Sequence, residues 1–69
     1  MQHKEVKSTN VLSVGYEPQH RSLEMIFRGG GHYRYANVPQ DVYDKLMASE
    51  SIGSAFHSLI KGQYEVERL

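Results

Sequence analysis

Six cationic or aromatic side chains in this sequence have the chemistry to hold an anionic, planar ligand. They are Arg28, His32, Arg34, Lys61, Tyr64 and Arg68. A guanidinium group can bond two phosphate oxygens at once or stack on a base, and a tyrosine ring offers a flat stacking surface. We expect Arg34 to contribute most, because it lies in the middle of a strand-like segment. These residue types predict contacts to nucleic acid.

Other patterns that could carry chemistry have weaker support. Gly29–Gly31 leads into a strand rather than a helix, so it predicts a hairpin turn instead of a phosphate-binding loop. The four histidines, His3, His20, His32 and His57, show no metal-ligand spacing and have no cysteine to join them, so we expect no metal site. There is no nucleophile elbow, catalytic triad or paired-carboxylate signature. We therefore expect neither enzymatic activity nor a cofactor.

The size and charge of the chain limit the remaining functional classes. Sixty-nine residues allow one small domain, and no cysteine is present to form a disulfide. Eight Lys and Arg residues balance eight Asp and Glu residues, which argues against tight non-specific binding to nucleic acid but allows a local basic patch. No apolar run is long enough to span a membrane, and the start of the chain lacks the apolar core of a signal peptide. We therefore expect a cytoplasmic protein.

Alternating apolar and polar residues predict three strands, at roughly residues 10–17, 22–28 and 32–37. The turns between them, at residues 18–21 and 29–31, set the register, since a shift by one residue would turn every side chain to the wrong face. The predicted cross-strand pairs are Tyr16–Leu23, Val14–Met25, Leu12–Phe27, Met25–Tyr35, Phe27–Tyr33 and Arg28–His32. Both registers gather apolar residues on one face, which predicts a three-stranded antiparallel meander.

Two helices are predicted after the strands, near residues 40–48 and 51–61, from apolar residues spaced three and four apart. Residues 1–8 are polar and aperiodic, which predicts a loosely ordered arm before a single domain of residues 9–69. The expected fold is α+β in the order β-β-β-α-α, with both helices packed on one face of the sheet. The predicted core consists of Leu12, Val14, Leu23, Met25, Phe27, Tyr33, Leu46, Phe56, Leu59 and Ile60.

The two faces of the predicted sheet differ in character. Tyr33 and Tyr35 face the core beside Met25 and Phe27, so we interpret them as packing residues rather than base-stacking residues. The opposite face is predicted to gather Arg28, His32 and Arg34 with Val11, Glu24, Ile26 and Ala36. Three interpretations of this face stay open: a solvated surface, a nucleic-acid-binding surface, or a homodimer contact centred on Ile26.

The segment Tyr33-Arg34-Tyr35, followed by Val38-Pro39, resembles the KTSC domain family, which is named for its place at the C-terminus of some lysyl-tRNA synthetases. Members also occur alone as small bacterial and phage proteins. The resemblance covers about residues 8–69. Its other matching positions are Ser8-x-Asn10, Gly15-Tyr16, Leu23-x-Met25-x-Phe27, Val42-Tyr43, Gly53, Phe56, Ile60-Lys61-Gly62-x-Tyr64 and Glu67-Arg68-Leu69. The synthetase association implies RNA binding, and the family offers no catalytic motif to carry over.

The residues and the resemblance together favour a small non-catalytic module that binds RNA, either tRNA or a single strand. The alternative is a protein-interaction or regulatory module that binds either another protein or a second copy of itself through the sheet face around Ile26. Near-zero net charge favours the alternative, whereas the synthetase association favours RNA. Neither interpretation includes a metal, a cofactor or a small-molecule substrate.

Overall fold

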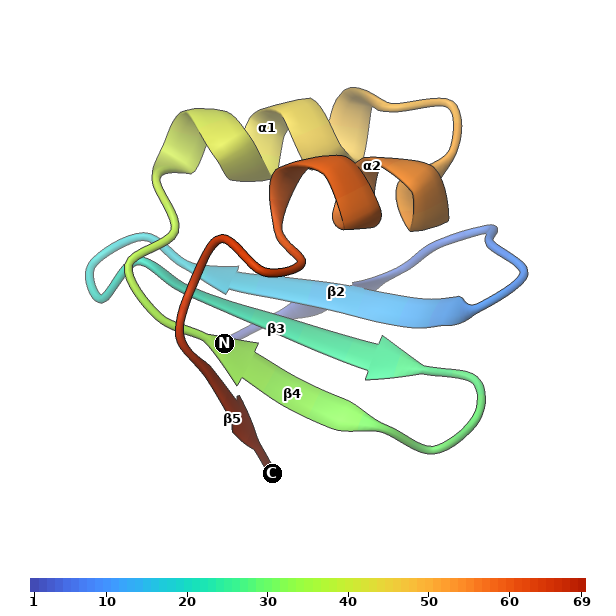
Figure 1. The fold of residues 1–69 in the computed structure, drawn as a ribbon, viewed down its shortest axis with the longest axis horizontal. Coiled ribbons are helices and arrows are strands. Elements are labelled where there is room, and N and C mark those ends of the chain that lie inside the picture. The colour runs from blue at the N-terminus through green and yellow to red at the C-terminus, as the bar shows by residue number, and fades with distance from the viewer.

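Five antiparallel strands form one sheet, and two helices lie together on one of its faces (Figure 1). The computed structural model describes all of residues 1–69. In the sheet, the strands are ordered as they are in the sequence. Their bounds are β1 (His3–Glu5), β2 (Val11–Glu17), β3 (Ser22–Phe27), β4 (His32–Tyr35) and β5 (Val66–Arg68). The α+β class and the antiparallel sheet agree with the sequence analysis, whereas the predicted number of three strands is wrong.

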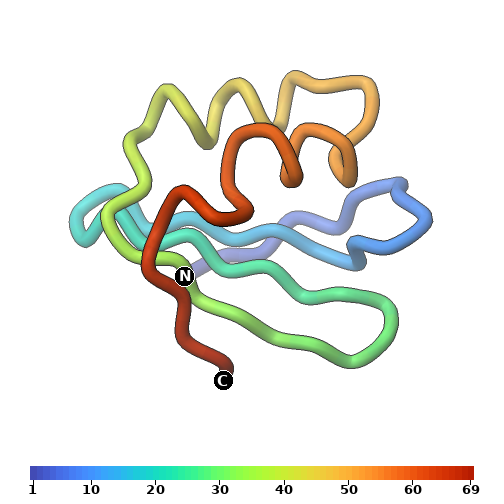
Figure 2. The backbone as a smooth tube through the Cα atoms, viewed as in Figure 1, coloured from blue at the N-terminus to red at the C-terminus, as the bar shows by residue number.

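The two strands that were not predicted lie at the two edges of the sheet. β1 pairs with β2, so the residues expected to form a loose arm contain a strand. The chain leaves the second helix, crosses to the other edge and pairs β5 with β4 (Figure 2). Each edge strand has only three residues and no apolar alternation. Because no apolar alternation marks these short segments, the hydrophobic pattern of the sequence gives no signal for them.

The pairing of β2 with β3 confirms two predicted contacts and corrects a third. Tyr16 lies opposite Leu23 and Val14 lies opposite Met25, as predicted. A bulge between Val11 and Ser13 then adds one residue to β2, so Val11 rather than Leu12 meets Phe27. As a result Val11 is fully buried and Leu12 is 40% exposed, the reverse of the prediction for both residues.

The pairing of β3 with β4 is shifted by two residues from the predicted register. Met25 lies opposite Tyr33, and Leu23 lies opposite Tyr35. The turn begins earlier than expected, because the Gly30 N–H donates to the Phe27 carbonyl and Gly30 takes a φ of +100°, which favours glycine. Arg28 therefore lies in the turn instead of pairing with His32. A shift of two residues preserves the faces, so both tyrosines still face the helices.

The helices are α1 (Gln40–Ala48) and α2 (Ile52–Leu59). The bounds of α1 match the prediction, and α2 is shorter than the predicted 51–61. Ser51 caps α2, since its Oγ accepts a hydrogen bond from the Ser54 N–H at 3.3 Å. None of the helices is long and apolar enough to cross a membrane.

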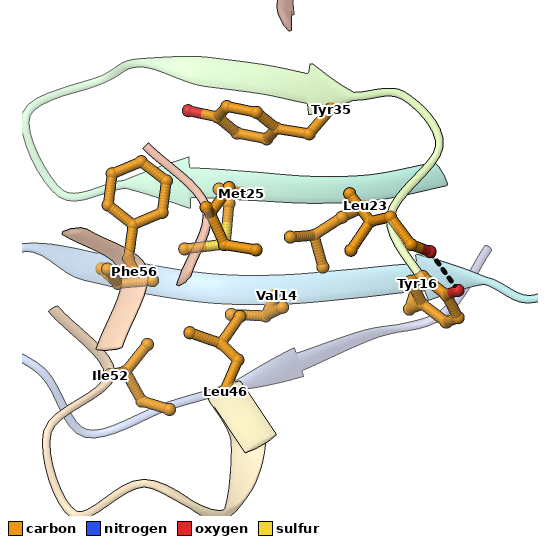
Figure 3. Close-up of a cluster of buried hydrophobic side chains, with 11 residues drawn as sticks. Val14, Tyr16, Leu23, Met25, Tyr35, Leu46, Ile52 and Phe56 are labelled. Atoms are coloured by element: carbon orange, nitrogen blue, oxygen red, sulfur yellow. Dashed lines mark hydrogen bonds between the residues drawn. The ribbon is translucent and has the colours of Figure 1, made fainter. Parts of the chain in front are cut away.

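The core fills the space between the helices and the sheet, and Figure 3 shows part of it. The buried apolar residues are Val11, Val14, Tyr16, Leu23, Met25, Tyr35, Val38, Leu46, Ile52, Phe56 and Ile60. Phe27, Tyr33 and Leu59 were predicted to be in the core and are only partly buried against it. The Tyr16 hydroxyl donates to the Val38 carbonyl (dashed line in Figure 3), which fixes the segment that leads into α1.

Candidate functional site

The six candidate residues do not share one face of the sheet, and only His32, Arg34 and Arg68 lie on strands. On β4, Arg34 points to the outer face, away from the helices, together with His32. Arg68, on β5, pairs with Tyr33 and shares its face, which is the helix side of the sheet. The six residues therefore do not form one site.

The outer face carries a cluster of charged side chains around Glu24, which is only 8% exposed. Its Oε1 lies 3.0 Å from His3 Nε2 and 3.2 Å from His32 Nε2. Its Oε2 accepts hydrogen bonds from Arg34 Nη2 at 3.2 Å and Nε at 3.3 Å. Burial acts to raise the pKa of Glu24, but hydrogen bonds from His3, His32 and Arg34 outweigh it and lower the pKa below its usual value. Glu24 therefore stays ionised as the shared acceptor of the cluster.

Arg34 is occupied within this cluster rather than free to meet a ligand. Besides its two bonds to Glu24, its Nη1 lies 3.4 Å from Glu67 Oε1 on the neighbouring β5. The sequence analysis placed Glu24 on this face but not Glu67, which β5 brings beside Arg34. Arg28 is also engaged, because its Nε donates to the Ser8 carbonyl at 2.9 Å. These contacts remove the basic character that the outer face was predicted to have.

An open groove of about 720 Å³ lies on the helix side of the sheet, between the β3–β4 turn, β5 and the C-terminal end of α2. Its aromatic lining residues are Phe27, Tyr33, Tyr35, Phe56, His57 and Tyr64. Lys61 and Arg68 also line it, and no Asp or Glu does. Strand alternation explains this separation of charge, since Arg68 faces the groove while its neighbour Glu67 faces Arg34 on the outer side. We call this feature the aromatic groove.

The Tyr33 ring forms part of the wall of the aromatic groove. Arg68 lies over this ring, with its guanidinium carbon 5.9 Å from the ring centroid, which is within range of a cation–π contact. The ring also crosses Gly31 so closely that a Cβ at that position would lie 2.7 Å from Tyr33 Cε2. Gly31 therefore makes room for Tyr33, a second role for the glycine run beyond the turn at Gly30.

The other groove residues differ in how accessible they are. Lys61 and Arg68 are exposed, whereas Tyr33 and Tyr64 are partly buried against the core. Tyr35 is buried, as the packing interpretation predicted, and burial raises the pKa of its hydroxyl above the ordinary value. Tyr35 is therefore part of the groove floor, and the partly exposed Tyr33 and Tyr64 provide its accessible rings.

Sequence reasoning missed both arrangements for the same reason. The aromatic groove and the outer cluster each depend on an edge strand that was not predicted. Without β5, nothing places Arg68 beside Tyr33, and without β1, His3 has no fixed position next to Glu24. The available signal was the presence of Lys61, Tyr64 and Arg68 near the end of the chain, which the sequence analysis named without Tyr33.

Comparisons with known proteins agree with this fold. The family model of the KTSC domain matches residues 7–64. The crystal structure of a KTSC domain protein from Yersinia pestis has a TM-score of 0.96 and 37% identity, covering 99% of this chain and 96% of that one. An uncharacterized protein from Stutzerimonas stutzeri is 34% identical over 64 residues, which are 93% of this chain and 90% of that protein.

A larger protein carries a similar segment. A lysine–tRNA ligase from a Nostoc species is 41% identical over 59 residues, which are 86% of this chain but only 10% of the ligase. The fold itself defines a small α+β module with two helices on one face of an antiparallel sheet. Within that class, the chain belongs to the KTSC domain family, in agreement with its sequence resemblance.

Proposed function

We propose that this protein is a non-catalytic RNA-binding module and that single-stranded RNA, or a single-stranded part of tRNA, lies in the aromatic groove. The observation that carries the proposal is the lining of the groove, which combines partly exposed aromatic rings with Lys61 and Arg68 and contains no acid. Proteins that bind single strands pair a positively charged groove with rings on which bases stack.

Each groove residue has a distinct part in this proposal. Lys61 and Arg68 neutralise phosphates at the rim, where both side chains are exposed. Tyr33 and Tyr64 offer rings for stacking, and the Arg68 guanidinium above Tyr33 extends that surface. Tyr33 thus changes role from the sequence interpretation, in which it served packing alone.

The choice of RNA rests on a relative rather than on the groove itself. A segment similar to this chain occurs in a lysine–tRNA ligase, a protein whose name specifies a tRNA substrate. The outer face contributes less to the proposal than the sequence analysis expected. Arg34 is held by Glu24 and Glu67, and a phosphate there would have to displace these carboxylates.

Removal of the two groove cations tests the proposal. The double variant Lys61→Ala/Arg68→Ala is expected to bind a short single-stranded RNA about tenfold more weakly or worse at low salt, because two phosphate contacts are lost. Each neutralised charge on a single strand contributes about 0.7 to the slope of log affinity against log salt. The loss of two charges should therefore reduce the magnitude of this slope by about 1.4. Fluorescence anisotropy with a labelled RNA at several salt concentrations measures both quantities.

A matched control separates a specific groove from overall charge. Lys4→Ala/Lys45→Ala removes the same two charges from exposed positions outside the groove, and should leave binding nearly unchanged. Equal losses in both double variants would show charge-driven association without a site. Absence of wild-type binding at micromolar concentrations and low salt would end the RNA proposal.

The alternative is a homodimer through the outer sheet face, which no helix covers (Figure 1). Ile26 is partly exposed there, but its neighbours include the charged cluster around Glu24, so the apolar surface is small. Sedimentation of wild type and Ile26→Glu tests this alternative. A wild-type dimer that the substitution converts to a monomer would favour it over the groove.

A further inference from the structure

Three side chains from three different strands converge on the outer face with the chemistry of a metal site. His3 on β1 and His32 on β4 both direct Nε2 toward Oε1 of Glu24 on β3, at 3.0 and 3.2 Å. The three atoms all lie within 4.8 Å of one another. A tetrahedral zinc ion with bonds of about 2.0–2.1 Å holds its ligand atoms roughly 3.3 Å apart, so small side-chain movements suffice to admit one.

Two of these side chains, His3 and Glu24, also have partners for the atoms that face away from the shared point. His3 Nδ1 lies 3.2 Å from Ser13 Oγ, which fixes the orientation of the ring. Glu24 Oε2 accepts from Arg34, which leaves Oε1 directed toward the two imidazoles. In metal sites, such outer hydrogen bonds orient histidine and carboxylate ligands and are as much a part of the site as the ligands.

The backbone below His3 is shaped to receive its ring. Gly15 pairs with His3 across the strands, and a Cβ at Gly15 would lie 2.7–3.0 Å from three atoms of the imidazole. The ring therefore lies flat against β2 at a position that only glycine leaves open. This contact brings Nε2 of His3 to Glu24 and gives Gly15 a role that its place within a strand does not otherwise explain.

We propose that His3, Glu24 and His32 form a binding site for a divalent first-row transition metal, with zinc as the principal candidate. Two imidazole nitrogens and one carboxylate oxygen are a ligand set that zinc commonly takes, with water in the fourth position. The charges around the site permit a cation to bind, because the two negative charges of Glu24 and Glu67 outweigh the single positive charge of Arg34. The site is separate from the aromatic groove and does not depend on RNA binding.

Metal binding at this place would join β1 to β3 and β4. Zinc replaces any proton on each Nε2 and satisfies Oε1, while Ser13 and Arg34 keep their outer contacts. A metal that binds only the folded chain raises its stability by mass action. Zinc should therefore raise the unfolding temperature as well as bind.

Titration of the untagged, metal-free protein with zinc chloride, followed by calorimetry, tests the site. We expect one zinc ion per chain with micromolar or tighter affinity, weakened at least tenfold in His3→Gln and in His32→Gln. His20→Gln is the matched control, because His20 lies exposed in the β2–β3 turn and should bind zinc as wild type does. Absence of wild-type binding, or equal affinity in His32→Gln, would overturn the proposal.

Gly15→Ala tests the geometry without removal of a ligand. The added methyl group displaces the His3 ring, so zinc affinity should fall at least tenfold. Cobalt(II) gives a second readout, since tetrahedral coordination produces visible absorption that zinc should abolish in wild type and that Gly15→Ala should lack. Wild-type affinity and absorption in Gly15→Ala would contradict the proposed placement of His3.

Discussion

Replacement of Leu23 with alanine is expected to destabilise the protein by about 2–5 kcal/mol, the range for a fully buried leucine. Leu23 is 0% exposed at the centre of the sheet, between Tyr16 on β2 and Tyr35 on β4 (Figure 3). A domain of 69 residues has a stability of about 3–10 kcal/mol at typical values per residue, so this loss removes much of it. Urea denaturation followed by circular dichroism measures the change.

Leu12→Ala provides the comparison within the same sheet. The bulge leaves Leu12 40% exposed, so its truncation should cost less than about 1 kcal/mol. The sequence pattern alone predicts similar losses for both leucines, because both occupy apolar positions of alternating strands. Equal losses at the two positions would contradict the bulge and the burial that follows from it.

Glu24→Gln is expected to destabilise the protein by about 1–3 kcal/mol at pH 7. The substitution keeps the size of the side chain but removes the charge that His3, His32 and Arg34 share. The amide oxygen of the substituted side chain still accepts a hydrogen bond, which limits the loss. Thermal unfolding of the two proteins in a metal chelator measures the difference without any contribution from metal.

The difference between wild type and Glu24→Gln should depend on pH. The folded pKa of Glu24 lies below its ordinary value of 4.5, so its ionised form stabilises the fold fully above that value. This stabilisation is lost as the pH falls through the folded pKa, and the two unfolding temperatures should converge. The other charged or titratable groups of the cluster are His3, His32, Arg34 and Glu67. A difference that stays constant down to about pH 3 would contradict the role assigned to the carboxylate.

The parts of the fold that follow from side-chain pattern could be predicted from the sequence. The alternation around Val14, Tyr16 and Leu23 correctly gave two strands and the β2–β3 register near the turn. The helical spacing around Leu46 gave the bounds of α1. The outward direction of Arg34 also followed, because a register error of two residues keeps each side chain on its face.

The incorrectly predicted parts of the fold depend on features of the backbone, a bulge and two edge strands, that no side-chain pattern indicates. One extra residue in the β2 bulge exchanged the environments of Val11 and Leu12. The edge strands joined the sheet through backbone hydrogen bonds, with the Leu69 N–H reaching the His32 carbonyl at 2.8 Å. Both candidate sites depend on such an edge strand. The sequence could therefore identify Lys61, Tyr64 and Arg68 by residue type, but it could not show that Tyr33 lies beside them.

Amide chemical shifts of the isotope-labelled protein test most directly the proposal that RNA binds in the aromatic groove. On titration with a short single-stranded RNA, we expect the largest shifts at Gly31, Tyr33, Lys61, Tyr64 and Arg68, which surround the groove. The amides of Glu24, Ile26 and Arg34 should change little, because their side chains belong to the outer face. The largest shifts on that outer face, or no shifts at any residue, would contradict the claim.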